Sequence, residues 1–316
     1  MNTVVSLFSN NSNVDMLRDS GYGDADFKVL KAPMTYSDTF GRTHKVEGKD
    51  MYYREDTGQQ LAIHGKRYKP VQHTTMIDTS RKILERSSLN LTDVREDIQV
   101  GSDGAMCFVK HTLPEHIIET PDGDTACMTM LHINSFNGVW SYQGSAGVLQ
   151  FACTNSQVFV GGAATIYKAR HTNALNVDHG ARLLNGILGI MDQQNNIWAE
   201  WAKRDCGPRE AFKYIAEAAG SKIALQMLHD GERIPEIIMY SKVNSNDGLM
   251  YMWNKYQDHY SHKLGQNYWS VYNVMTDWSS HHVGRRRKNA LDIPVAQLKK
   301  SDKVQEIITK AFPIAA

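Results

Sequence analysis

The stretch TPDGDTACMTMLHINSFNG, residues 120–138, decides the fold class of this chain. Two turn signals, Pro121-Asp122-Gly123 and Asn137-Gly138, flank the apolar segment 126–134. Asp-Gly and Asn-Gly pairs are typical of the tight reversals that join antiparallel strands. The stretch therefore predicts a strand with a chain reversal at each end.

The same pattern continues on both sides of this stretch. Asp103-Gly104 marks another reversal before it, and GVLQFAC at 147–153 is another apolar segment after it. We therefore predict an antiparallel β-meander over residues 94–153. A helix over 75–88 is predicted to cover the meander, because its apolar residues share one helical face: Met76, Ile77, Ile83 and Leu84.

The remaining segments divide the chain into three regions, and the predicted fold class is α+β. Residues 1–58 are polar and are expected to form an irregular N-terminal arm with short strands. Residues 59–175 hold the antiparallel sheet with its helix, preceded by two short strands around Gly65. Residues 176–316 are expected to be mainly helical and continuous with the same core. Helices are predicted at 177–202, from Pro208 to Gly220, at 248–262, at 267–282 and after a cap at Ser301.

Composition limits the classes of function. The 316 residues are 41% hydrophobic and carry a net charge of +1, so any attraction for a polyanion has to be local. Four cysteines without CxxC spacing argue against a zinc ribbon and a disulfide scaffold, and fit a reducing cytoplasm. We find neither a leader-like segment nor an apolar run of the ~18 residues that a membrane span needs. A cytoplasmic protein without a membrane partner is expected.

Histidine and aspartate groups offer a catalytic alternative. They lie in two stretches and comprise Asp178, His179, Asp258, His259 and His262. A metal site usually needs three or four ligands with supporting partners, and these residues are scattered. Half-buried or solvated histidines are the simpler interpretation, so we assign no metal, no cofactor and no catalytic residue. A His/Asp-dependent enzyme is the less favoured alternative.

Basic residues mixed with aromatic residues are the most repeated signal. The mixture suits single-stranded nucleic acid, because cations follow the phosphates and flat rings stack on unpaired bases. Between residues 281 and 303 there are seven Lys/Arg and two Asp, a local charge of +5 that begins where the 267–282 helix is predicted to end. A solvated loop, or one that pairs with the acidic segment 92–124, is the competing interpretation. The candidate nucleic-acid contacts are Lys66, Arg67, Tyr68, Lys69, Lys168, Arg170, Arg285, Arg286, Arg287 and Lys288.

Five short motifs, in this order and spacing, resemble a known family. They are YKPVQ (68–72), NSFNG (134–138), CTN (153–155), ARHT (169–172) and WSVYNVMTDW (269–278). The resemblance covers about residues 60–285 and is to a phage- and plasmid-borne family named domain of unknown function 932. It implies a bacteriophage or plasmid origin and an accessory role in DNA metabolism within the host bacterial cytoplasm. The family supplies no established site residues.

A weaker analogy concerns phage single-strand annealing recombinases, in which a β-meander packs on a helix beside a basic groove. With the basic and aromatic residues, it leads us to expect a single-stranded DNA-binding or annealing protein that acts as a homo-oligomer in recombination. Such a function needs binding rather than catalysis. Besides the enzyme, the alternative is a phage accessory protein that modulates a host complex. In every case, layered α+β folds are common and do not fix a function.

Overall fold

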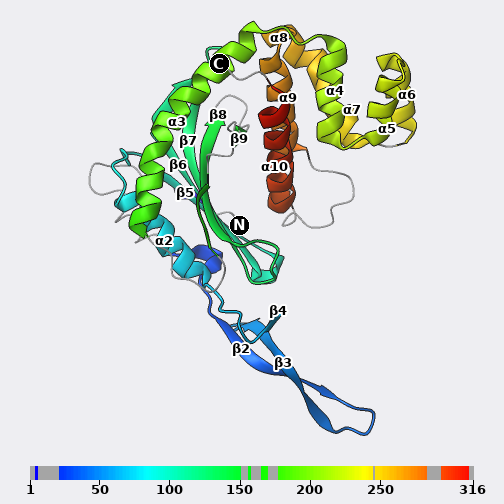
Figure 1. The fold of residues 1–316 in the computed structure, drawn as a ribbon. Coiled ribbons are helices and arrows are strands. Elements are labelled where there is room, and N and C mark those ends of the chain that lie inside the picture. Colours follow the sequence, from blue (N-terminus) through cyan, green and yellow to red (C-terminus); the bar gives the residue numbers. More distant parts are fainter. Residues whose placement is uncertain are drawn as a thin grey trace. The chain divides into compact units, whose positions relative to one another are not determined.

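The computed structural model describes residues 4–5, 21–150, 156–157, 165–169, 177–244, 246–282 and 293–312 (Figure 1). The chain divides into two compact units. Unit 1 comprises residues 1–116, 128–146 and 164–188, and unit 2 comprises residues 117–127, 147–163 and 189–316.

The larger sheet has seven strands in the order β1-β5-β6-β7-β8-β10, with β9 paired to β8. Its strands are β1 (Val4–Val5), β5 (Arg95–Gly101), β6 (Met106–Glu119), β7 (Thr125–Ser135), β8 (Tyr142–Gln150), β9 (Ser156–Gln157) and β10 (Thr165–Ala169). The pairs β1–β5, β5–β6, β8–β9 and β8–β10 are antiparallel. The predicted meander is confirmed.

The three predicted reversals join consecutive strands. Asp103 has a φ of 57° and Gly104 a φ of 103°, and they connect β5 to β6. Gly123 and Gly138 also have positive φ and lie in the β6–β7 and β7–β8 connections. These conformations cost glycine little, which explains why local sequence predicts the turns.

Helix α2 (His73–Glu85) packs on this sheet within unit 1. Met76, Ile77, Ile83 and Leu84, the predicted apolar face, are fully buried. The ring Nε2 of His73 lies 2.9 Å from the carbonyl oxygen of Gly104 in the β5–β6 turn. The α+β class is therefore confirmed: an antiparallel sheet packed on a helix precedes a mainly helical C-terminal half.

A buried ion pair joins α2 to β5. Arg81 donates from Nε and a terminal nitrogen to the two carboxylate oxygens of Glu96, at 3.0 and 2.6 Å, and both side chains are 2% exposed. His111 on β6 approaches the same carboxylate at 2.8 Å. Burial alone would raise the pKa of Glu96, but the hydrogen bonds from His111 and Arg81 outweigh it and hold the pKa below its usual value.

Two strands of a second, three-stranded antiparallel sheet lie in the segment expected to be an irregular arm with short strands, and its third strand is the one predicted before Gly65. Its strands are β2 (Val29–Ser37), β3 (Thr43–Arg54) and β4 (Gln60–Gly65), in the order β2-β3-β4. The strands β2 and β3 are longer than the short strands that we expected. Most of their residues are exposed or half-buried, so their composition is that of a polar segment. The second strand expected after Gly65 is absent, and residues 66–67 form a turn.

The C-terminal half contains the helices α3 (Val177–Lys203), α4 (Pro208–Ala219), α5 (Lys222–His229), α6 (Ile234–Val243), α7 (Asp247–Lys255), α8 (Ser261–Leu264), α9 (Tyr268–His281) and α10 (Ile293–Ala311), with a π-helical segment at Tyr256–Tyr260. Helix α4 begins at Pro208 and is ended by Gly220, whose φ is 68°, as predicted. Ser301 is not a cap, because α10 begins at residue 293.

Aromatic side chains fill the helical core of unit 2. Trp198, Trp201 and Trp269 are at most 1% exposed, and the ring of Trp269 stacks on Tyr272 with 5.3 Å between centroids. Trp269 also donates from Nε1 to Asp122 at 3.3 Å. Of the helices that the structure describes, none combines the length and the apolar composition that a bilayer crossing requires.

Candidate functional site

The inner face of the β2–β4 sheet is anchored within unit 1. Tyr52 is fully buried, and its hydroxyl donates to the carbonyl oxygen of Tyr68 at 3.1 Å. The rings of His64 and Tyr68 stack with 3.9 Å between centroids, and the Tyr68 hydroxyl donates to Ser135 at 3.4 Å. Burial raises the pKa of Tyr68. The structure therefore places Tyr68, a predicted base contact, in the anchor of the sheet, with His64 against its ring.

The outer face of the same sheet carries apolar and aromatic side chains. Since alternate residues of a strand point to opposite faces, Met51 and Tyr53 lie on the face opposite Tyr52. In the observed register Leu30 is opposite Tyr53, while Ala32 and Ile63 flank Met51. Leu30 and Ile63 are exposed, and the other three are half-buried. We call these five residues and Tyr36 the outer face.

Aromatic residues continue along the β2–β3 hairpin. Tyr36 is 56% exposed and stacks on His44, which is opposite it in the register, with 5.1 Å between centroids. Phe40 is 80% exposed in the loop between the strands. Sequence reasoning missed both residues, because they lie in a segment interpreted as a polar arm.

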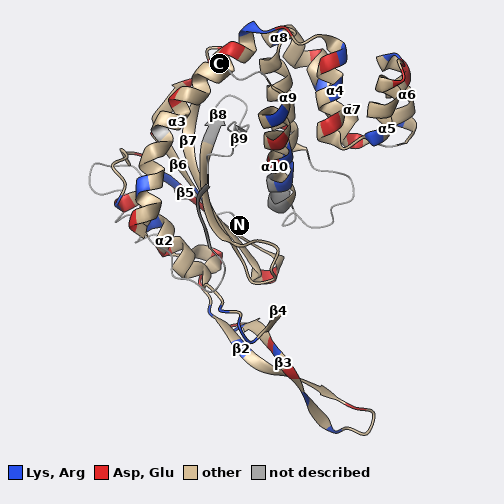
Figure 2. Ribbon diagram, in the orientation of Figure 1, with Lys and Arg blue, Asp and Glu red and all other residues tan. Residues whose placement is uncertain are grey.

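Basic residues outnumber acidic residues in the segment that carries the outer face. Residues 28–69 contain nine Lys/Arg and five Asp/Glu, a net charge of +4 (Figure 2). The predicted contacts Lys66, Arg67 and Lys69 are exposed in the segment that follows β4. Lys66 has one weak ion pair, at 3.9 Å from Glu47, with both side chains more than half exposed. This cationic turn can therefore reorganise toward phosphate groups at little cost.

The side chains of the other predicted contacts are not among those that the structure describes. Lys168 lies in β10, opposite Gln143 of β8, and only its backbone is described. Arg170 and residues 285–288 lie outside the described residues. Helix α9 ends at His281, as expected for a helix that precedes the arginine run.

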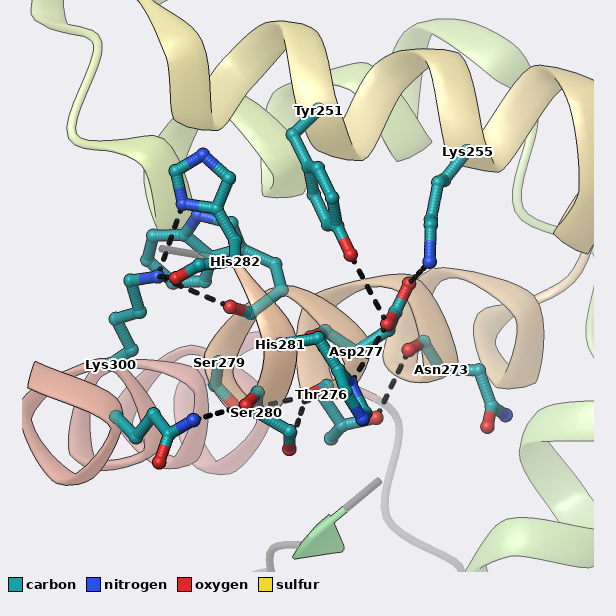
Figure 3. A network of polar contacts seen from close by, with 12 residues as sticks. Tyr251, Lys255, Asn273, Thr276, Asp277, Ser279, Ser280, His281, His282 and Lys300 are labelled. Carbon is teal, nitrogen blue, oxygen red and sulfur yellow. Dashed lines mark hydrogen bonds and ion pairs between the residues drawn. The ribbon is translucent and has the colours of Figure 1, made fainter. Parts of the chain in front are cut away.

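A polar network surrounds Asp277 on α9 in unit 2 (Figure 3). The Asp277 side chain is 4% exposed. Its carboxylate lies 2.6 Å from Lys255 Nζ, 3.1 Å from His281 Nδ1 and 3.3 Å from the Tyr251 hydroxyl. Burial lowers the pKa of Lys255, but the hydrogen bonds to Asp277 and Tyr251 raise it more, so the pKa lies above its usual value. The carboxylate thus balances the charge of Lys255 and orients the side chains of Tyr251 and His281.

The contact between Asp277 and His281 bears on the catalytic alternative. His281 Nδ1 lies 3.1 Å from the Asp277 carboxylate and 3.3 Å from the Asp277 backbone carbonyl oxygen, so both are acceptors near this nitrogen. An imidazole held through Nδ1 leaves Nε2 as the nitrogen that a general base would use. His259 and His262, by contrast, are exposed and lie in the segment between α7 and α9. Among the residues that the structure describes, no group of three or more His, Cys, Asp or Glu side chains could hold a metal ion.

Replacing Asp277 by Asn is expected to lower the free energy of unfolding by about 1.5–3 kcal/mol, because hydrogen bonds to a charged group contribute about that much. The pKa of Lys255 should fall at the same time, since it loses the carboxylate that raises it. Urea unfolding and NMR titration of the lysine measure the two effects. Asp258→Asn, at an exposed position, is the control and should change neither quantity. An unchanged Lys255 pKa in D277N would contradict the ion pair.

The comparison with known families identifies the chain. It belongs to the family described as Domain of unknown function (DUF932), whose model matches residues 60–301. This match includes β4, the turn after it and the Asp277 network, whereas β2 and β3 precede it. No curated protein and no solved structure matches the chain. The predicted family is confirmed, while the phage or plasmid origin and the annealing function stay predictions.

Proposed function

We propose that this protein binds single-stranded DNA and promotes the annealing of complementary strands. In this proposal it is encoded by a phage or plasmid and acts as a homo-oligomer in the host bacterial cytoplasm. The observation that carries the proposal is the outer face of the β2–β4 sheet, where exposed and half-buried aromatic and aliphatic side chains lie within a segment of net positive charge. Annealing itself requires no covalent chemistry.

Stacking on bases and attraction to phosphates would each contribute to binding. Tyr36 and Tyr53 offer rings to unpaired bases, and stacking of this kind tolerates any base. Lys66, Arg67 and Lys69 offer cations to the phosphates, and the run at 285–288 adds more if it reaches the same strand. Several copies along one strand would multiply weak contacts through effective concentration.

The binding test uses fluorescence anisotropy of labelled oligonucleotides of unrelated sequence at several salt concentrations. Replacing Lys66, Arg67 and Lys69 together by Ala should weaken binding equally for all sequences and reduce the slope of log affinity against log salt by about 2, at about 0.7 per phosphate contact. The same result is expected for Arg285→Ala, Arg286→Ala and Arg287→Ala combined. Lys203, Lys222 and Lys310, all exposed on helices, provide a control triple that removes the same charge.

Annealing is measured separately, as the rate at which two labelled complementary strands pair. Wild-type protein should accelerate pairing, and the Lys66/Arg67/Lys69 triple should do so less. A folded wild-type protein that binds no oligonucleotide at low salt would refute the proposed function.

An accessory interaction protein is the second candidate, and helix α6 favours it. Met239 and Val243 on this helix are 71% and 84% exposed. A helix with large apolar residues on its solvent side is typical of a protein-binding surface. Capture of a specific host protein that is lost in Met239→Glu/Val243→Glu, with no DNA binding by the wild type, would favour this candidate.

A further inference from the structure

The loop of the β2–β3 hairpin has a fixed backbone. We call residues 38–42 the hairpin tip. One carboxylate oxygen of Asp38 accepts from the backbone N–H groups of Phe40 and Arg42, each at 2.9 Å. The other accepts from Arg42 Nε at 3.0 Å and lies 2.9 Å from His44 Nε2. The Asp38 side chain therefore holds the backbone of the loop and the side chains of Arg42 and His44 in place.

Phe40 is presented outward by this arrangement. Its backbone is held by Asp38, while its ring is 80% exposed. The guanidinium carbon of Arg42 lies 5.2 Å from the centre of the ring. Gly41 supplies the left-handed conformation, with a φ of 79°, that closes the loop. A large apolar ring held outward on a closed loop has the form of a wedge.

The groups around the wedge select the partner. Asp38 and Arg42 are each two residues from Phe40, so a bilayer would have to accept their charges together with the ring. Nucleic acid suits the set better: apolar side chains inserted between bases unstack them, and nearby cations contact the phosphates. A two-stranded β-ribbon also fits the major groove of a duplex.

We propose that Phe40 inserts between bases where a single strand meets a duplex, so that the hairpin tip binds the junction. The inference rests on the proposed function and adds a second contact to it. The outer face would hold the unpaired strand, and the tip would unstack the first base pair. Because a phenyl ring makes no hydrogen bonds, the insertion would be independent of sequence.

The test compares a single strand with a forked duplex that carries 2-aminopurine at the junction, whose fluorescence rises on unstacking. Phe40→Ala should abolish most of the rise caused by the wild type and weaken binding to the fork by at least about fivefold, the lower end of what one lost stacking contact contributes. Its affinity for the single strand should change by less than about twofold, because the outer face and not Phe40 would hold the unpaired strand. Folding should also be unaffected, since a side chain that is 80% exposed contributes no core packing.

Two further variants test the geometry of the tip. Phe40→Trp keeps a flat ring and should retain the fluorescence rise. Asp38→Ala leaves Phe40 in place but removes the four contacts that hold the tip, so it should reduce the rise although the ring is present.

Each outcome separates the two proposals. If Phe40→Ala matches the wild type on the fork, or if the wild type causes no fluorescence rise while binding single strands, the wedge is refuted and the proposed function stands. If the wild type binds neither the single strand nor the forked duplex, the wedge and the proposed function are both refuted. Binding to anionic phospholipid vesicles that is lost in Phe40→Ala, without an effect on the fork, would overturn the wedge in favour of a membrane contact.

Discussion

Glu96→Gln is expected to lower the free energy of unfolding by about 3–5 kcal/mol, the cost of breaking a buried ion pair by removing one partner. Arg81 is 2% exposed, so its guanidinium cannot regain water when Glu96 loses its charge. Hydrogen bonds hold the pKa of Glu96 below its usual value. The charged carboxylate therefore stabilises the folded protein fully at pH values above the usual pKa of a glutamate. The stabilisation is lost as the pH falls through the lowered pKa. The difference between wild type and variant should therefore shrink in acid, as urea unfolding at several pH values measures.

Two variants make this prediction specific. Glu306→Gln removes a carboxylate from an exposed pair with Lys310 and should leave unfolding unchanged within error. Arg81→Met combined with Glu96→Gln should recover part of the loss, because no unpaired cation is then buried. Equal effects of Glu96→Gln and Glu306→Gln would contradict the assignment of Glu96 as a structural partner of α2.

The parts of the fold that local chemistry determines were predictable. Asp-Gly and Asn-Gly pairs marked the meander turns, and Pro208 and Gly220 marked the ends of α4. Helix α6 was not predicted, because its sequence IPEIIMYSKV is apolar on most sides and shows no helical periodicity. The contact between Arg81 and Glu96 was not predictable, because it joins residues 15 positions apart through tertiary packing.

The candidate site was predictable only in its charges. Lys66, Arg67 and Lys69 were recognised as a basic cluster, and the structure exposes them. Whether an aromatic residue is available for stacking depends on the face of the strand that it occupies. Tyr52 and Tyr53 are adjacent in sequence, yet one is fully buried and the other lies on the outer face. The register of β2, β3 and β4 decides this, and no local pattern reveals it.

Tyr36→Ala combined with Tyr53→Ala is expected to weaken binding to single-stranded oligonucleotides by at least about 30-fold, because stacking on an aromatic side chain contributes about 1–3 kcal/mol per base. Anisotropy titrations measure this effect, and circular dichroism checks that the double variant is folded. Tyr36→Phe with Tyr53→Phe keeps both rings and should bind as the wild type does. Tyr240→Ala, an exposed tyrosine on α6, is the matched control for the loss of a ring elsewhere.

The salt dependence distinguishes the rings from the cations of the same interface. Removing two rings eliminates no phosphate contact, so the double variant should bind more weakly at every salt concentration with an unchanged slope of log affinity against log salt. The Lys66/Arg67/Lys69 triple should instead change the slope. If the tyrosine variant also reduced the slope, the rings would act by positioning cations, as the stacking of Tyr36 on His44 would permit. If it retained full affinity, bases would not contact the outer face, and that face would be a surface for protein instead.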